Sequence, residues 1–255
     1  MLLSPLGPAL RYGCPRGRSN DGVCARAGGA PDMNVRVERK KLLEPTLTEL
    51  PHGPHGLARD LVTGSQRQRL LFGVTVVVAD RGYPNVTVAD IAAAAKVSRR
   101  TFYQHFPDKE ACFLAAAETG RDLMIEHLEQ VMRQVFAEPV EPFEALQRGI
   151  REYLTLLRDE PSFARSFYLE TAVAGSRAIE SFGRCQRWFA GFIRSWREAA
   201  GPVGPPVPDY AYLAVTDATN EAVRRTLRAG GDLLELEDTV MYIHRALLGL
   251  AMPVD

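Results

Sequence analysis

The chain has 255 residues, 46% of them hydrophobic and 24% charged, with a formal net charge of zero. This length suits one or two domains of an ordinary globular protein. No apolar stretch approaches membrane-spanning length, and the proline-broken N-terminus is a poor signal peptide, so we expect a soluble, cytoplasmic protein without membrane contact.

The charge is unevenly placed along the chain. The net charge is +3 over residues 1–60, +3 over residues 61–114 and −6 over the rest. A basic N-terminal part suits a protein held by phosphate contacts, and an acidic remainder suits a domain that faces away from DNA.

The four cysteines, Cys14, Cys24, Cys112 and Cys185, form no C-x-x-C pair and have no histidine at zinc spacing. We therefore expect no metal site, no cofactor and no disulfide framework. Cys112 and Cys185 are interpreted as buried thiols, with redox sensing left as an alternative. No catalytic constellation is present either, so an enzyme is not expected.

Residues 1–56 are rich in proline, glycine and arginine and lack periodicity, which predicts a disordered extension. Met33 is a second candidate for the start of translation. The segment GPHGLARD (53–60) resembles a basic arm, and Arg59 is a candidate for a minor-groove contact, although a plain surface arginine is an equal alternative.

Helical periodicity begins after this extension. One apolar stripe comprises Leu70, Leu71, Val74, Val77 and Val78, and Gly82 ends the helix. We assign residues 57–114 to a helix-turn-helix DNA-binding domain.

The segment 87–110 carries the functional signal. Thr87 is an N-cap with Asp90 as its capping-box partner, and Ser98 is a second N-cap, so one short helix ends near Lys96 and another begins at Arg99. Phe102 and Phe106 lie four residues apart and anchor the second helix inward. This pattern predicts a helix-turn-helix whose second helix enters the DNA major groove.

The exposed face of that second helix has the chemistry of base and phosphate recognition, since Arg and Gln bind base edges and hydroxyls bind phosphates. Asp108 caps the next helix, where Lys109 and backbone N–H groups form a candidate phosphate site. His105 is either a packed or a phosphate-facing histidine. The candidate DNA-binding residues are Arg59, Thr87, Lys96, Ser98, Arg99, Arg100, Thr101, Tyr103, Gln104, His105 and Lys109.

From about Gln66 to Leu114 the sequence resembles the TetR/AcrR family of transcriptional regulators, most densely in VSRRTFYQHFPDKE (97–110). Lys96 departs from the family's usual glycine in the turn and should carry left-handed strain there. The resemblance implies an all-helical, dimeric fold. It also implies that residues 115–255 form a ligand-binding and dimerisation domain.

Beyond Lys109 the pattern is helix after helix, which predicts an all-α protein of about nine helices. The expected ranges are 108–136, 142–158, 161–174, 176–200, 209–229 and 232–250, with a loop at 201–208.

The helix from Ser176 carries an aromatic stripe that is interpreted either as core or as the wall of an apolar ligand cavity. The candidate ligand-binding residues are Trp188, Phe189, Phe192, Trp196, Tyr168 and Asn220, with Glu170, Thr216 and Glu221 as further polar candidates. For each polar residue, a surface or interface position is the alternative.

The last two helices hold long apolar stripes, which predict a four-helix interface between two copies. The residues are Leu213, Ala222, Val223, Leu227, Leu233, Leu236, Val240, Ile243, Leu247 and Leu250. The functional hypothesis is a repressor that binds a roughly palindromic double-stranded DNA operator as a homodimer and is released by a small apolar effector. The alternatives are an activator, a helical enzyme and an interaction module without DNA binding.

Overall fold

The computed structural model describes Leu43 and residues 59–137, 139–199 and 205–250. Apart from Leu43, the predicted disordered extension of residues 1–56 lies outside the described residues, and so do the Met33 alternative and residues 201–204 of the predicted loop at 201–208. Within them the chain is all-helical, as the sequence predicts. The helices are α1 (Arg59–Arg81), α2 (Val88–Ala94), α3 (Arg99–His105), α4 (Lys109–Val135), α5 (Pro142–Asp159), α6 (Pro161–Ala174), α7 (Ser176–Ala199), α8 (Asp209–Ala229) and α9 (Glu237–Leu248), with 3-10 turns η2 (Tyr83–Asn85) and η3 (Leu233–Leu236).

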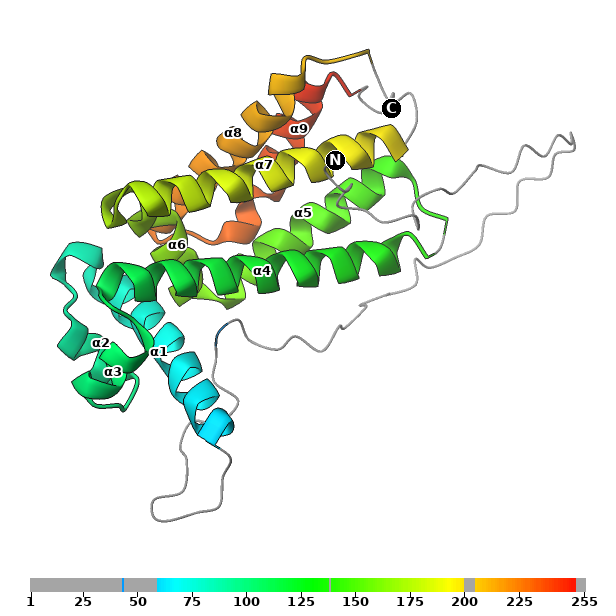
Figure 1. Cartoon of the computed structure of the whole chain (residues 1–255). Helices are drawn as coiled ribbons and strands as arrows, with labels where there is room; N and C mark the ends of the chain where they lie inside the picture. The colour runs from blue at the N-terminus through cyan, green and yellow to red at the C-terminus, as the bar shows by residue number, and fades with distance from the viewer. Residues whose placement is uncertain (1–42, 44–58, 138, 200–204, 251–255) are drawn as a thin grey trace, which may run out of the picture.

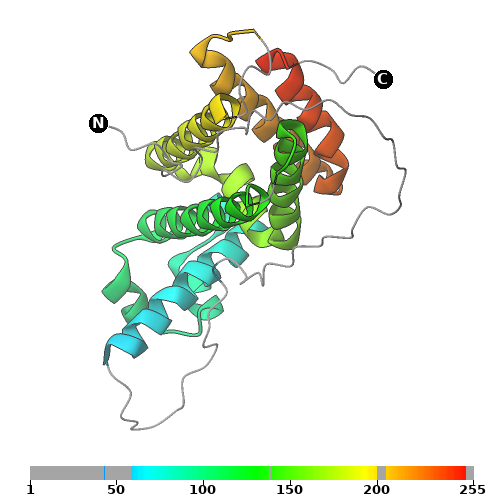
Figure 2. The same ribbon diagram turned by 90° about the vertical axis from the view of Figure 1, so that its right-hand side faces the viewer.

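The long helix α4 connects the two ends of the molecule. In both views the pair α2–α3 and the pair α8–α9 lie at opposite ends, and α4 crosses the predicted domain boundary at residue 114 without a break (Figure 1, Figure 2). Helix α6 packs along α1, so the C-terminal helices contact the N-terminal ones directly. The ends of the fold are therefore joined through α4 and α6.

Helices α4 and α6 cross at very close range. A Cβ atom placed on Gly120 of α4 would lie 2.3 Å from Cε2 of Phe163 on α6, which is closer than any side chain tolerates. Glycine at this position lets the Phe163 ring pack against the α4 backbone. The crossing fixes how α6 sits between α4 and the aromatic side chains of α7.

One element boundary differs from the sequence prediction. The predicted helix 232–250 begins as the 3-10 turn η3, because the Asp232 carboxylate accepts a hydrogen bond from the N–H of Leu234 and tightens the first turn. The α-helix then starts at Glu237 and ends at Leu248, with Gly249 in the left-handed conformation. Among the described residues, no helix combines the length and the apolar composition that crossing a bilayer requires.

Candidate nucleic-acid interface and ligand cavity

The first short helix is fixed by a complete capping box. The N–H of Asp90 donates to Oγ1 of Thr87 at 3.3 Å, and the N–H of Thr87 donates to Oδ2 of Asp90 at 2.9 Å. Hydrogen bonds from Thr87 and then the charge of Arg81 hold the pKa of the Asp90 carboxyl below its usual value. The Thr87 hydroxyl is exposed but already bonded to Asp90, so a phosphate would meet a preordered group.

The turn between α2 and α3 has the predicted left-handed residue. Lys96 has a φ of 52°, and its N–H and that of Val97 bond back to α2 carbonyls. A non-glycine residue in this region carries strain of about 1–2 kcal/mol. On the other side of the turn, a Cβ on Gly73 would come within 3.1 Å of the Ala95 nitrogen, so α1 lies directly against the turn.

Helix α3 divides into a buried and an exposed face. Phe102 is fully buried and Phe106 nearly so, as predicted, and Ser98 caps the helix by accepting from the N–H of Thr101 at 3.0 Å. The opposite face holds the exposed side chains Arg99, Arg100, Tyr103 and Gln104, and the Tyr103 side chain is 57% exposed. The described residues offer none of these four a hydrogen-bond or ion-pair partner, so their polar groups point to solvent ready for an external ligand.

Lys109 has a task different from the predicted one. Its ammonium donates to the carbonyl oxygens of Tyr83 and Val86, each at 2.8 Å, and lies 4.2 Å above the centre of the Tyr83 ring. Burial lowers the pKa of the Lys109 ammonium. Two of its three N–H donors are turned inward to hold η2 and the approach to α2, which favours a structural role over the predicted phosphate contact.

His105 lies beside Gln66, with 3.4 Å between its Nε2 and the amide oxygen, and burial followed by the charge of Arg67 lowers the pKa of its imidazole. This half-buried, neutral ring favours the packed alternative over a phosphate contact. Arg59 is the first residue of α1, and the arm residues before it lie outside the described part of the chain.

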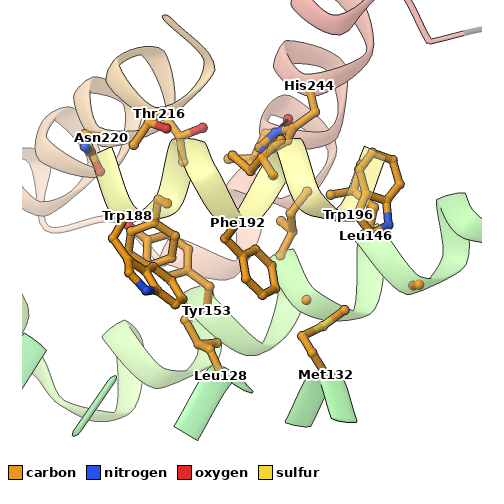
Figure 3. A pocket seen from close by; sticks show the side chains of 17 residues that line it. Leu128, Met132, Leu146, Tyr153, Trp188, Phe192, Trp196, Thr216, Asn220 and His244 are labelled. Atoms are coloured by element: carbon orange, nitrogen blue, oxygen red, sulfur yellow. Dashed lines mark hydrogen bonds between the residues drawn. The ribbon is translucent and has the colours of Figure 1, made fainter. Parts of the chain in front are cut away.

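A cavity lies among α4, α5, α7, α8 and α9. Its volume of about 90 Å³ is several times what one water molecule needs, about 10–15 Å³. Figure 3 shows Trp188 and Phe192 of α7 facing Leu128 and Met132 of α4. The lining residues are Leu128, Met132, Ala145, Leu146, Gly149, Ile150, Tyr153, Trp188, Phe189, Phe192, Ile193, Trp196, Thr216, Thr219, Asn220, Val240 and His244. The four α7 aromatics and Asn220 therefore line a cavity, which favours the cavity-wall interpretation over core packing for the stripe and over a surface position for Asn220.

Tyr168 does not line this cavity, in contrast to the prediction. Its hydroxyl instead bonds to that of Tyr153, with 2.5 Å between the oxygens, and burial raises the pKa of both phenols. Tyr153 lines the cavity, so Tyr168 contacts a lining residue without lining the cavity itself. The sequence pattern assigns neither Tyr153 nor His244, which also lines the cavity, to a ligand site, although each sits at helical spacing among apolar neighbours.

Two polar candidates for ligand contact also lie elsewhere. The Glu170 carboxylate accepts a hydrogen bond from the N–H of Tyr83 at 2.8 Å, which joins α6 to η2. Glu221 forms ion pairs with Arg224 and Arg225 at the surface. Helical periodicity placed both on apolar helices but could not give the direction each faces.

The predicted dimer stripe is only partly available for an interface. Val223, Leu227, Leu233, Val240 and Leu250 are buried within the subunit, so these five pack inside one chain instead. The large apolar side chains that α8 and α9 expose are Tyr210, Tyr242 and Leu247.

The paired short helices, the tight turn and the polar face of α3 define a helix-turn-helix protein. The sequence model of a family described as "Bacterial regulatory proteins, tetR family" matches residues 75–116, which include α2, the turn and α3. This part of the chain therefore carries the DNA-binding segment of that family.

Curated relatives and solved structures agree with that assignment. The chain is 27% identical over 161 residues to the HTH-type transcriptional regulator EthR of Mycolicibacterium smegmatis, covering 58% of this chain and 63% of EthR. It is 32% identical over 125 residues to the HTH-type transcriptional repressor Rv1474c of Mycobacterium tuberculosis, covering 47% and 66%. The chain thus spans just under two thirds of the length of these relatives.

Among solved structures, FadR from Bacillus subtilis in complex with stearoyl-CoA aligns with a TM-score of 0.58 at 19% identity, covering 72% of this chain and 98% of FadR. The fatty acid degradation regulator FadR from Bacillus halodurans aligns with a TM-score of 0.59 at 19% identity, covering 72% and 94%. At this identity the likeness shows the fold.

Proposed function

We propose that this protein is a ligand-responsive, DNA-binding transcriptional regulator, and that it is a repressor released from its operator by a small, mostly apolar molecule. The observation that carries the proposal is the exposed face of α3, where Arg99, Arg100, Tyr103 and Gln104 have no partner within the described residues. Arginine and glutamine in this position suit base edges in the major groove.

The names of the relatives support a repressor of this kind. Rv1474c is named a transcriptional repressor, and the two FadR proteins from Bacillus subtilis and Thermus thermophilus were solved with stearoyl-CoA and lauroyl-CoA. A molecule with this task works in the cytoplasm as a homodimer on a roughly palindromic operator. The exposed apolar side chains of α8 and α9, Tyr210, Tyr242 and Leu247, are the proposed contacts between the two copies.

The fold offers two connections from the cavity to the DNA-binding helices. Helix α4 carries Leu128 and Met132 in the cavity wall, and its first residue, Lys109, holds η2. Helix α6 carries Tyr168 behind the wall and, two residues on, Glu170, which also bonds to η2. A ligand releases DNA only if it binds the DNA-incompetent arrangement of these helices more tightly.

The test of DNA recognition is a gel shift on the DNA that flanks the protein's own gene. Replacing Arg100 by Ala should weaken specific binding by about 1–3 kcal/mol, since a base-edge contact is lost. Arg225→Ala is the matched control, because Arg225 is an exposed arginine on α8 at the other end of the molecule. Unchanged operator affinity in both Arg99→Ala and Arg100→Ala would refute recognition through α3.

A further inference from the structure

The cavity lining contains no Asp, Glu, Lys or Arg side chain. An ionised group moved from water into such surroundings is strongly disfavoured unless a partner charge meets it. The wall provides no such partner, so the part of a ligand that enters the cavity should be uncharged.

His244 gives the cavity a hydrogen-bond acceptor. Its Nδ1 lies 2.8 Å from the carbonyl oxygen of Val240, one helical turn back, and a carbonyl only accepts, so Nδ1 carries the proton of the neutral ring. Burial lowers the pKa of this imidazole to about 4, which keeps it neutral at physiological pH. Nε2 therefore presents a lone pair, and no described residue donates to it.

Two residues of the cavity lining have polar groups that lack hydrogen-bond partners. The indole N–H of Trp196 and the hydroxyl of Thr219 have no hydrogen-bond partner, and these side chains are only 2% and 7% exposed. Buried polar groups are nearly always hydrogen-bonded, and each one left unpaired disfavours the folded state. Both atoms have almost no accessible area, so a ligand reaches them only if these two side chains shift.

The lining also indicates an elongated ligand. Trp188 and Trp196 lie eight residues apart on α7, which corresponds to about 12 Å along the helix axis. In Figure 3, Asn220 lies toward the Trp188 end, and His244 projects from α9 between the two indoles. The acceptor thus sits along the length of the cavity.

We propose that the cavity binds an uncharged, elongated, mainly apolar molecule that carries a hydroxyl group, and that this hydroxyl donates a hydrogen bond to Nε2 of His244. A hydroxyl group carries the proton that this hydrogen bond needs and has no charge. Ethers and esters accept but cannot donate, and a carboxylate adds a charge that the wall does not neutralise. The inference rests on the proposed function in that this molecule is the effector.

The test compares three probes of equal chain length, 1-octanol, octyl methyl ether and octanoate, with the whole protein. Both tryptophans of the chain line the cavity, so their fluorescence reports its occupancy. The alcohol should bind about three- to tenfold more tightly than the ether, since the ether leaves Nε2 unpaired. Octanoate at pH 8 should bind at least about tenfold more weakly than the alcohol. Equal affinities for alcohol and ether would overturn the inference.

Two variants of equal side-chain length assign the effect to His244. His244→Gln keeps an acceptor oxygen at the end of the side chain and should preserve the preference for the alcohol. His244→Met has no comparable acceptor and should abolish it. His127→Met is the control, because His127 pairs with Glu152 outside the cavity. A preference that survives in folded His244→Met would contradict the role of His244, and the comparison of probes on the unaltered protein stands even if a variant does not fold.

Gel shifts with the same probes separate this inference from the proposed function. Release of operator DNA by octanoate as readily as by octanol would refute the hydroxyl preference and leave the regulator proposal standing. Alcohol-selective, saturable binding that never alters operator affinity would refute the sensor role, while the chemistry of the site would stand.

Discussion

Stability should fall as pH drops below neutrality, because His244 is buried as a neutral ring. Its imidazole pKa is lowered from 6.5 to about 4 in the folded protein, by burial first, against a smaller opposing effect of the bond to Val240. Between pH 6.5 and about pH 4, His244 is protonated in the unfolded chain but stays neutral in the folded chain. The contribution of the neutral His244 ring to the free energy of unfolding is therefore fully present above pH 6.5. It is lost progressively as the pH falls to about 4.

The size of the effect follows from the shift. Each pKa unit corresponds to about 1.4 kcal/mol, so the full loss is about 3 kcal/mol, of which about 2 kcal/mol is reached at pH 5. The other titratable side chain in the cavity wall is Tyr153, and burial raises its pKa, so it stays neutral throughout this range. Nothing else in the wall changes charge with pH.

The measurement is urea unfolding at pH 8 and pH 5, followed by circular dichroism, for the unaltered protein and for His244→Met. The variant lacks the group, so its stability should decline by about 2 kcal/mol less over this interval. His105 and Asp90, whose pKa values are also lowered, are present in both proteins and cancel in the difference. Parallel declines in the two proteins would show that His244 is not held neutral by the fold.

Three further outcomes follow from the contacts. Lys109→Met should lower the free energy of unfolding by about 1–3 kcal/mol, because two carbonyls lose their donor, and should leave the salt dependence of DNA binding unchanged; a salt slope lower by about one unit with full stability would restore the phosphate role. Tyr168→Phe should keep ligand binding measured by fluorescence but weaken the effect of ligand on operator affinity, and undiminished release would exclude this connection. Leu247→Glu, at a 40% exposed position, should shift sedimentation from dimer toward monomer, and an unchanged dimer would place the interface elsewhere.

The short-range features of the fold could be predicted from sequence. Caps at Thr87, Ser98 and Asp108 each join a side chain to a backbone N–H three residues on, so spacing alone identifies them. The left-handed turn at Lys96 follows from a motif in which only four residues, 95–98, connect two short helices. The buried stripe of α1 follows from helical periodicity in the same way.

Features that depend on which helices face one another could not be predicted in this way. Lys109 at a helix N-terminus suits a phosphate as well as a carbonyl, and only the position of η2 decides between them. Tyr168 and Tyr153 lie on neighbouring helices with similar apolar patterns, yet only Tyr153 lines the cavity. His244 has no partner motif in the sequence. Its role as a hydrogen-bond acceptor depends on the cavity that residues of five helices line.

Tyr83 is where the two connections from the cavity meet. Its N–H donates to Glu170 of α6, its carbonyl accepts from Lys109 of α4, and its ring packs under the Lys109 ammonium and against Phe113. Because η2 leads directly into the capping box at Thr87, a change in the spacing of α4 and α6 acts on the start of α2. On the proposed function, an effector that enlarges the cavity need only separate these two helices slightly to change how α3 is presented to DNA.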